Sequence, residues 1–406
     1  MQERPRQAVI LAGGRGERLR PLTDTRPKHL VEVGGRPFLD HLLRLLSEQG
    51  FDRVLLLLGY LPQATVDFIG NGQRYGARLE YRKTPADWQT SLRLRDAQPH
   101  LDQRFLLLYC DNYWPMPFLR MWDSYRAGGA PAQITVYENT DGWSRSNVRF
   151  EHDGRVIRYD KTRLAADLNG VDIGFALLDR GSLDVLPDGN VPVEAALYPA
   201  LAAQGKLRAF PTKHRYYGVG TPERLALTAE FLNSRPTVIL DRDGVLNRKP
   251  AIGAYVRSWD DWEWLPGSLE ALRLLHEAGW RVLVATNQAG VARGALRATE
   301  LTEIHRRMQQ QARRAGGKIE AVYCCPHGWD AGCGCRKPAP GLLFQAQKDF
   351  HLDLSRTWFL GDDERDAQAA EKAGCRFAMV DQQNPLLACA SRWTQAVEEE
   401  ACLSVC

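Results

Sequence analysis

The feature that most constrains the fold is a repeated alternation of short apolar runs with helical patterns. Apolar runs of strand length lie at 8–12, 54–58 and 105–109, and again at 237–240, 281–285 and 357–360. Near-continuous apolar runs of this length, separated by helices, are typical of parallel strands that are buried on both faces. The sequence therefore predicts an α/β fold in both halves of the chain.

Two segments have clear helical spacing. Residues 37–50 place apolar side chains on one helical face and end at Gly50. Residues 268–279 follow the same pattern, with Ser268 as the expected N-cap and Gly279 as the expected stop. Such helices provide the crossovers that parallel strands require.

The length of the chain predicts more than one domain, because 406 residues exceed what a single core usually holds. A helix-like pattern ends near Leu232, and a new strand begins at Thr237. We therefore expect a first domain over 1–232, a linker over 233–236 and a second domain over 237–406.

The composition is 44% apolar and 25% charged, with a net charge of +4, which is typical of a globular protein. No basic run suggests a nucleic-acid partner, and apolar runs such as 54–58 are too short to span a bilayer. With no signal-peptide pattern at the amino terminus, we expect nine reduced cysteines and a cytoplasmic location. Anionic small molecules suit the charge, and the oligomeric state stays open.

Three predicted strands of the second half run directly into polar residues. Asp241 to Asp243 follow the first, Thr286 to Gln288 the second and Gly361 to Asp363 the third. Because parallel strands end at one sheet edge, these carboxylates are expected to converge and bind Mg²⁺. One Asp could then attack phosphorus while another transfers protons. The alternative is that these residues only form turns and helix caps.

The motifs "DRDGVLN", "TNQAGVARG", "CRKPAPG" and "GDDERDAQAA" resemble those of haloacid dehalogenase (HAD)-type phosphatases. The resemblance covers about 236–385 and is greatest to the branch of heptose-bisphosphate and histidinol phosphatases. It implies a HAD-like Rossmannoid domain with Asp241 as nucleophile and Asp243 as general acid and base. It further implies a set of binding residues: Thr286, Asn287, Arg336 and Lys337 for substrate and phosphate, with Asp241, Asp362 and the Asp243 carbonyl for Mg²⁺.

The same half contains a Cys-x-His and a Cys-x-Cys pair, formed by Cys325, His327, Cys333 and Cys335. Three thiolates and one imidazole make a closed tetrahedral set that suits structural Zn²⁺. We expect this metal to hold a Gly-rich loop so that the adjacent Arg336 and Lys337 point at the phosphate. The alternative is a group of free buried cysteines without metal.

In the first half, a Gly-rich loop follows the first strand and offers backbone N–H groups to a triphosphate. The pattern "VILAGGRGERLRPLTDTRPKHLVEVGGRPF" resembles sugar-1-phosphate nucleotidyltransferases of the GT-A-like, Rossmann-like type, across about 7–230. The resemblance implies the following residues: Leu11, Gly13, Gly14, Gly16 and Arg18 for the nucleotide, Arg15 and Lys28 for catalysis, Asp111 for Mg²⁺, and Lys161, Asp172 and Glu194 for the sugar phosphate.

Several positions depart from these patterns. Gly218 stands where the family's second metal-binding Asp is expected, and residues 84–94 replace its Gly-rich base-binding turn. In the second half, Asp363 stands where a basic residue is expected, and the loop between His327 and Cys333 is short.

Together the resemblances imply a bifunctional enzyme of activated-heptose biosynthesis. It would remove the C7 phosphate of D-glycero-D-manno-heptose 1,7-bisphosphate and then transfer a nucleotidyl group, with GMP favoured, to heptose 1-phosphate. One alternative is a phosphatase whose first domain is a catalytically degenerate binding module. Another is a histidinol-phosphate phosphatase.

Overall fold

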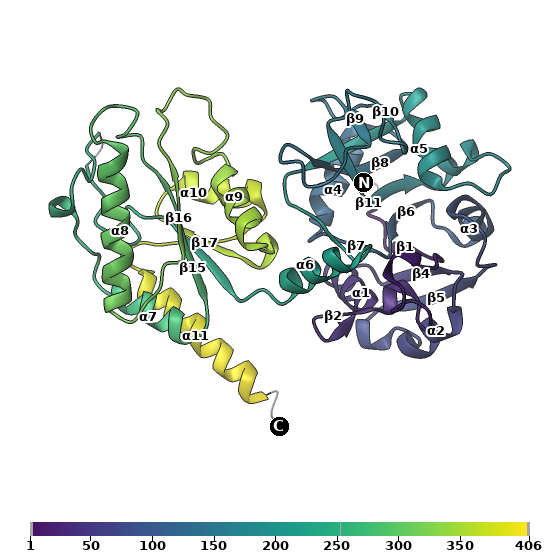
Figure 1. Cartoon of the computed structure of the whole chain (residues 1–406), viewed down its shortest axis with the longest axis horizontal. Helices are drawn as coiled ribbons and strands as arrows, with labels where there is room; N and C mark the ends of the chain where they lie inside the picture. Colours follow the sequence, from purple (N-terminus) through teal and green to yellow (C-terminus); the bar gives the residue numbers. More distant parts are fainter. Residues whose placement is uncertain (1–2, 252, 404–406) are drawn as a thin grey trace. The chain divides into compact units, whose positions relative to one another are not determined.

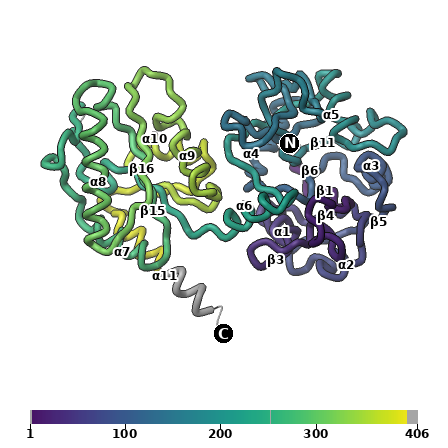
Figure 2. Tube along the Cα trace, viewed as in Figure 1, coloured from purple at the N-terminus to yellow at the C-terminus, as the bar shows by residue number. Residues whose placement is uncertain are grey.

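The chain folds into two compact α/β domains that meet in the sequence between Leu232 and Asn233. The computed structural model describes residues 3–251 and 253–403. A short segment leads from helix α6 (Pro222–Leu232), the last helix of the first domain, to β14 (Thr237–Leu240) of the second (Figure 2). Each domain has its own sheet with helices on both faces (Figure 1).

The first domain is built on a mixed sheet of nine strands with the main order β10-β9-β11-β6-β1-β4-β5, and β8 joins β11 to β12. Its strands are β1 (Gln7–Ala12), β4 (Arg53–Leu58), β5 (Arg78–Lys83), β6 (Arg104–Tyr109), β8 (Ala132–Glu138), β9 (Val148–Phe150), β10 (Val156–Tyr159), β11 (Gly170–Asp179) and β12 (Leu207–Thr212). Two short ribbons pair β2 (Glu32–Val33) with β3 (Arg36–Pro37), and β7 (Asn112–Tyr113) with β13 (Tyr217–Gly218).

The parallel strands of this sheet reverse their direction of winding at β1. Strands β4 and β5 extend the sheet on one side of β1, and β6 lies on its other side, parallel to it. Ligands bind at such switch points, outside the carboxyl ends of the strands. The Gly-rich loop after β1 and Asp111 after β6 therefore lie at the same edge.

Two apolar clusters cover the faces of the first sheet. The helices that supply them are α1 (Phe38–Glu48), α2 (Pro62–Ile69), α4 (Phe118–Gly128) and α6 on one face, and α3 (Thr90–Ala97) and α5 (Val193–Ala203) on the other. Helix α1 confirms the helix expected over 37–50, because its Leu side chains at three- and four-residue spacing are buried.

The second domain contains a parallel five-stranded sheet with the order β16-β15-β14-β17-β18. Its strands are β14 (Thr237–Leu240), β15 (Arg281–Asn287), β16 (Ala321–Cys325), β17 (Trp358–Gly361) and β18 (Arg376–Met379). The winding reverses between β14 and β17, so the loops after these two strands form the switch point of this sheet.

Helices cover both faces of the second sheet, as Figure 1 shows. They are α7 (Ser268–Glu277), α8 (Ala298–Arg314) and α11 (Leu386–Leu403) on one face, and α9 (Gly341–Phe350) and α10 (Glu364–Ala373) on the other. The expected Ser268 cap is wrong: Gly267 is the N-cap, because the Ser268 hydroxyl is buried and donates to the Val245 carbonyl at 3.1 Å.

Among the described residues, no helix is both long and apolar enough to cross a membrane.

We expect truncation of a central strand residue to destabilise the first domain. Leu56 in β4 is completely buried, so Leu56→Ala should lower the free energy of unfolding by about 2–5 kcal/mol in urea denaturation. Leu164→Ala is the matched control, because Leu164 is 76% exposed and its loss should change stability by less than about 0.5 kcal/mol. Equal stabilities for the two variants would contradict this packing.

Candidate active sites

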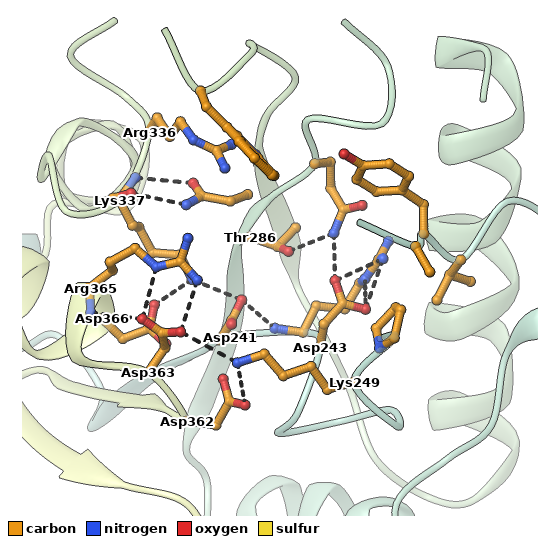
Figure 3. A pocket seen from close by; sticks show the side chains of 18 of the residues that line it. Asp241, Asp243, Lys249, Thr286, Arg336, Lys337, Asp362, Asp363, Arg365 and Asp366 are labelled. Carbon is orange, nitrogen blue, oxygen red and sulfur yellow. Dashed lines mark hydrogen bonds and ion pairs between the residues drawn. The ribbon is translucent and has the colours of Figure 1, made fainter. Parts of the chain in front are cut away.

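A buried ion cluster lies at the switch point of the second sheet (Figure 3). Asp241 follows β14 directly, and the Lys337 ammonium contacts its carboxylate at 2.8 Å and that of Asp366, on α10, at 2.7 Å. Lys337 also donates to the Ala285 carbonyl at 2.9 Å. Burial raises the pKa of Asp241, and the Lys337 charge opposes that rise. The cluster therefore holds a carboxylate nucleophile candidate against a fixed cation.

A third carboxylate completes an acidic pocket suited to a cation. Oxygen atoms of Asp241, Asp362 and Asp366 lie within 4.8 Å of one another. Asp362 Oδ1 and Asp366 Oδ2 are buried without a hydrogen-bond partner, while the Lys249 ammonium contacts Asp362 Oδ2 at 2.8 Å. Gly244, at φ 96°, lets the backbone pass against Asp362, where a Cβ would collide with the carboxylate. Unpaired carboxylate oxygens fit Mg²⁺, which prefers oxygen ligands.

Asp243 points away from this acidic pocket and is held by nitrogen donors (Figure 3). Its carboxylate accepts hydrogen bonds from the buried Arg242 guanidinium at 2.9 Å, from Asn247 Nδ2 at 2.9 Å and from Gln288 Nε2 at 2.7 Å. Burial disfavours the ionised form, but these donors outweigh it and lower the pKa of Asp243. Asp243 is therefore held in its ionised form.

The remaining residues predicted for this site surround the same cavity of about 570 Å³. The Thr286 hydroxyl is buried and accepts a hydrogen bond from Gln288 at 2.9 Å. Asn287 bonds the Lys337 backbone in both directions, at 3.0 and 3.1 Å, so it positions Lys337. Arg336 lines the cavity, and its guanidinium donates to the His327 carbonyl at 3.4 Å.

The four predicted zinc ligands come together at the end of β16. The Sγ atoms of Cys325 and Cys333 are 3.6 Å apart, and those of Cys333 and Cys335 are 3.5 Å apart. His327 Nδ1 lies 3.2 Å from Cys335 Sγ and 3.5 Å from Cys325 Sγ. A tetrahedron with bonds of about 2.0–2.3 Å has edges of about 3.3–3.8 Å, so these four separations are close to those of a Zn²⁺ site.

In the first domain, a cavity of about 630 Å³ lies at the switch point beside β1. Ten predicted residues line it: Leu11, Gly13, Gly14, Arg15, Gly16, Arg18, Lys28, Asp111, Lys161 and Glu194. The Lys28 ammonium contacts the Asp111 carboxylate at 2.5 Å. This pair places one cation and one carboxylate at the mouth of the Gly-rich loop, where a triphosphate and its metal would need them.

A buried arginine that the sequence analysis missed supports the Gly-rich loop. Arg93, on α3, donates to the carbonyls of Leu58 and Pro85 at 2.9 Å each and to that of Gly13 at 3.5 Å. A Cβ on Gly13 or Gly59 would collide with its guanidinium. Arg93, which belongs to segment 84–94, thus connects that segment to the Gly-rich loop.

A second cavity of about 510 Å³ adjoins the first, sharing Arg18, Lys161 and Glu194 among its lining residues. Asp172 lines it, accepting hydrogen bonds from the Tyr159 hydroxyl and the Gly174 amide at 2.9 Å each. Burial raises the pKa of Asp172 to about 6. Carboxylates and cations therefore line one polar cavity.

Gly218 lies next to the metal-ligand candidate Asp111 but brings no carboxylate. It pairs with Asn112 in the β7–β13 ribbon, and a side chain at position 218 would meet Asn112 Oδ1 and the Asp111 carbonyl. Any second carboxylate for a metal at Asp111 must therefore come from another segment, and Glu194 lines both cavities with Asp111.

Sequence reasoning missed several residues that the fold brings to these sites. They are Arg242, Lys249, Gln288 and Asp366 in the second domain, and Asp87, Trp88 and Arg93 in the first. Asp366 had a signal, since it is the third aspartate of "GDDERD" and falls in the first turn of α10. Arg93 had none, because its pattern is that of an ordinary helix residue.

We expect Gly13→Ala to be far more damaging than Gly14→Ala. The added Cβ at position 13 would collide with the Arg93 guanidinium, whereas position 14 has no atom within 4 Å. Gly13→Ala should lose about 1–3 kcal/mol in thermal or urea unfolding, and Gly14→Ala much less. Equal tolerance of both would contradict the placement of Arg93.

The raised pKa of Asp172 predicts a pH-dependent cost of folding. Between about pH 4 and 6 the folded state holds a proton that the unfolded state releases, so stability falls as pH rises and stays lower above 6. Asp172→Asn should therefore be more stable than the natural chain at pH 8, by on the order of 1–3 kcal/mol, with a smaller difference at pH 5. Urea unfolding at both pH values measures this, with exposed Asp167→Asn as control. A pH-independent difference would contradict it.

Comparisons with known proteins agree with this division of the chain. A Nucleotidyl transferase family model matches residues 7–160, and a HAD-hydrolase-like model matches 334–385. D-glycero-beta-D-manno-heptose-1,7-bisphosphate 7-phosphatase of Bordetella bronchiseptica is 46% identical over 138 residues, which are 34% of this chain and 76% of the relative. The enzyme of the same name from Pseudomonas aeruginosa is 43% identical over 147 residues, which are 36% of this chain and 82% of the relative.

Solved structures identify the fold of the first domain. HddC from Yersinia pseudotuberculosis has a TM-score of 0.50 and 23% identity, covering 56% of this chain and 99% of its own. A putative glucose-1-phosphate thymidylyltransferase from Bacillus anthracis has a TM-score of 0.51 and 20% identity, and the match covers 56% of this chain and 95% of that one. The chain therefore belongs, through its second domain, to the HAD-like heptose-1,7-bisphosphate 7-phosphatase family, and it joins that phosphatase to a nucleotidyltransferase-type first domain.

Proposed function

We propose that the chain is a bifunctional enzyme that removes the C7 phosphate of D-glycero-D-manno-heptose 1,7-bisphosphate and then joins heptose 1-phosphate to a nucleotide. The observation that carries this proposal is the Asp241–Lys337–Asp366 cluster at the switch point of a domain that is 46% identical to such a phosphatase. The first domain adds the Lys28–Asp111 pair at its own switch point. Small-molecule sugar phosphates and a nucleoside triphosphate are the partners.

In the phosphatase reaction, an Asp241 oxygen attacks phosphorus and displaces the sugar C7 oxygen, which leaves an aspartyl-phosphate. Lys337 and Thr286 bind the transferring phosphoryl oxygens. Asp243 must first gain a proton to protonate the leaving oxygen, and as a carboxylate it then takes a proton from the attacking water. Asp241, Asp362 and the Asp243 carbonyl would hold Mg²⁺, with Asp366 nearby, and the ion would offset phosphoryl charge.

In the transfer reaction, the sugar 1-phosphate oxygen attacks the α-phosphorus of the nucleotide and pyrophosphate leaves. Arg15 and Lys28 would neutralise the charge that develops on the phosphates. Asp111 would bind the accompanying Mg²⁺, and Lys161, Asp172 and Glu194 would hold the sugar phosphate. Each domain thus performs one of two successive steps on the same sugar.

We propose guanine as the base, on the residues that line the first cavity. Asp87 and Trp88 line the cavity on the segment 84–94. The Asp87 carbonyl accepts from Asn190 Nδ2 at 3.1 Å, which fixes the turn. A carboxylate only accepts hydrogen bonds, and guanine offers two neighbouring donors, N1–H and N2–H, that match it. The Trp88 ring supplies a surface on which the base can stack.

Gly218 favours a second candidate function, in which only the phosphatase is active. Without a carboxylate at position 218, the metal site at Asp111 has one fewer ligand than the resemblance implies. The first domain would then bind heptose 1-phosphate without converting it.

Reciprocal variants test the bifunctional proposal. Asp241→Asn should abolish phosphate release from heptose 1,7-bisphosphate, by at least about 10³-fold, because it removes the nucleophile. It should leave transfer from GTP to supplied heptose 1-phosphate unchanged, and Asp111→Asn should do the reverse.

Each variant serves as the folding control of the other in this experiment. Phosphate release by Asp241→Asn at the natural rate would contradict the nucleophile assignment. Absence of transfer in every sample would leave the phosphatase-only candidate, and faster hydrolysis of histidinol phosphate than of the bisphosphate would overturn the heptose assignment.

We also propose that Cys325, His327, Cys333 and Cys335 bind one structural Zn²⁺ that orders the loop carrying Arg336 and Lys337. Cys335→Ser should lose zinc, measured by elemental mass spectrometry, and should raise the KM for the bisphosphate as the loop loosens. Cys324→Ser is the matched control, because Cys324 adjoins Cys325 on β16 but lies outside the cluster. Equal zinc content in the two variants would contradict the site.

A further inference from the structure

The second cavity of the first domain, lined by Lys161, Asp172 and Glu194, is called the sugar cavity here. One residue that lines it has a backbone conformation that its residue type disfavours. Among the described residues, three that are not glycine have a left-handed φ: Leu61 at 45°, Arg163 at 60° and His351 at 48°. His351 is the C-cap of α9, where a left-handed residue commonly ends a helix. Leu61 is the N-cap of α2 and lies outside the two cavities of the first domain. Arg163 lies between β10 and β11 and caps no helix. Its conformation therefore needs another explanation.

Asp160 imposes the conformation of Arg163 through a set of hydrogen bonds. Its carboxylate accepts from the amides of Thr162, Leu164 and Ala165 at 2.8, 2.9 and 3.0 Å, and from the Thr162 hydroxyl at 2.5 Å. The Asp160 carbonyl also accepts from the Arg163 amide at 3.1 Å. A non-glycine residue persists in this region only where its surroundings determine it in this way. The loop is thus built to hold Arg163 in place.

The Arg163 side chain lines the sugar cavity together with Lys161 of the same loop. Asp172 also lines this cavity, and the Arg163 charge opposes the rise in the Asp172 pKa. The described contacts give the Arg163 side chain no hydrogen bond or ion pair with another residue, unlike Arg158 beside it, which pairs with Asp167 at 2.6 Å. The guanidinium therefore keeps its donors available to an anion in the cavity.

We propose that Arg163 binds the phosphate of the sugar 1-phosphate, with Lys161 on the side of the nucleotide. This inference rests on the proposed transferase function of the first domain. Lys161 lines both cavities, whereas Arg163 lines only the sugar cavity, so the two cations bracket a phosphate at their junction. Arg163 is suited to the role because its planar fork of donors matches phosphate oxygens. Asp160 is the positioning residue.

Glycine at position 163 makes the proposal testable, because glycine adopts a left-handed φ without strain. Arg163→Gly should therefore preserve or raise the melting temperature while it removes the side chain. Titration calorimetry of the full chain with heptose 1-phosphate should show affinity lowered roughly 10- to 100-fold. The KM for GTP should stay within about twofold, because the nucleotide loop is untouched. Arg163→Lys should restore part of the affinity, and exposed Leu164→Ala should behave like the natural chain.

The outcomes separate this inference from the proposed function. If the natural chain binds heptose 1-phosphate and Arg163→Gly binds it as tightly, the assignment of Arg163 is overturned. If Arg163→Gly melts earlier and weakens GTP and sugar phosphate alike, Arg163 has a structural role only. If the natural chain binds no heptose 1-phosphate while its phosphatase works, the transferase function fails and this inference falls with it.

Discussion

The second domain depends on one buried ammonium group. Lys337 is 3% exposed and contacts Asp241 and Asp366, which come from a strand end and a helix start that are far apart in the sequence. Burying such a charge is costly unless it is paired, and removal of one partner leaves an uncompensated charge. Lys337 therefore connects the sheet edge, α10 and the loop that follows β16. Asp362 adds a third carboxylate to the cluster. Because carboxylate oxygens of Asp362 and Asp366 are buried without a hydrogen-bond partner, a divalent cation would be stabilised there.

The first domain also has a lysine–carboxylate pair at its switch point, but other residues support it. In each domain a strand ends beside its parallel neighbour at the switch point, and a lysine from a distant loop contacts a carboxylate there. The difference lies in what supports the loop. Cys325, His327, Cys333 and Cys335 lie together in the loop before Lys337, whereas the buried Arg93 guanidinium supports the Gly-rich loop of the first domain through backbone carbonyls. The cluster lies in the loop over 325–335, and Arg93 contacts the Gly-rich loop after β1. Both loops contain glycine and have little apolar surface of their own.

The fold class could be predicted from the sequence because apolar run length and helical spacing are local properties. Residues such as Asp241 and Asp362 could also be placed at one sheet edge, because each follows a predicted strand and parallel strands end at the same edge. Partners that depend on tertiary packing could not be read in this way. Nothing in the sequence indicates that Arg242 turns back onto Asp243, that Arg93 fills the space beside Gly13, or that Ser268 bonds Val245 instead of capping its helix. The role inferred for Arg163 could not be predicted from the sequence either, because it depends on the left-handed backbone conformation of that residue.

The most direct measurement is a product analysis of the natural chain. It would be incubated with D-glycero-D-manno-heptose 1,7-bisphosphate, Mg²⁺ and an equal mixture of four nucleoside triphosphates, and the products would be resolved by mass spectrometry. The account predicts one activated sugar, GDP-heptose without a C7 phosphate, together with phosphate and pyrophosphate. Accumulation of heptose 1-phosphate alone would contradict the transferase half, and unchanged bisphosphate would contradict the central claim for both domains.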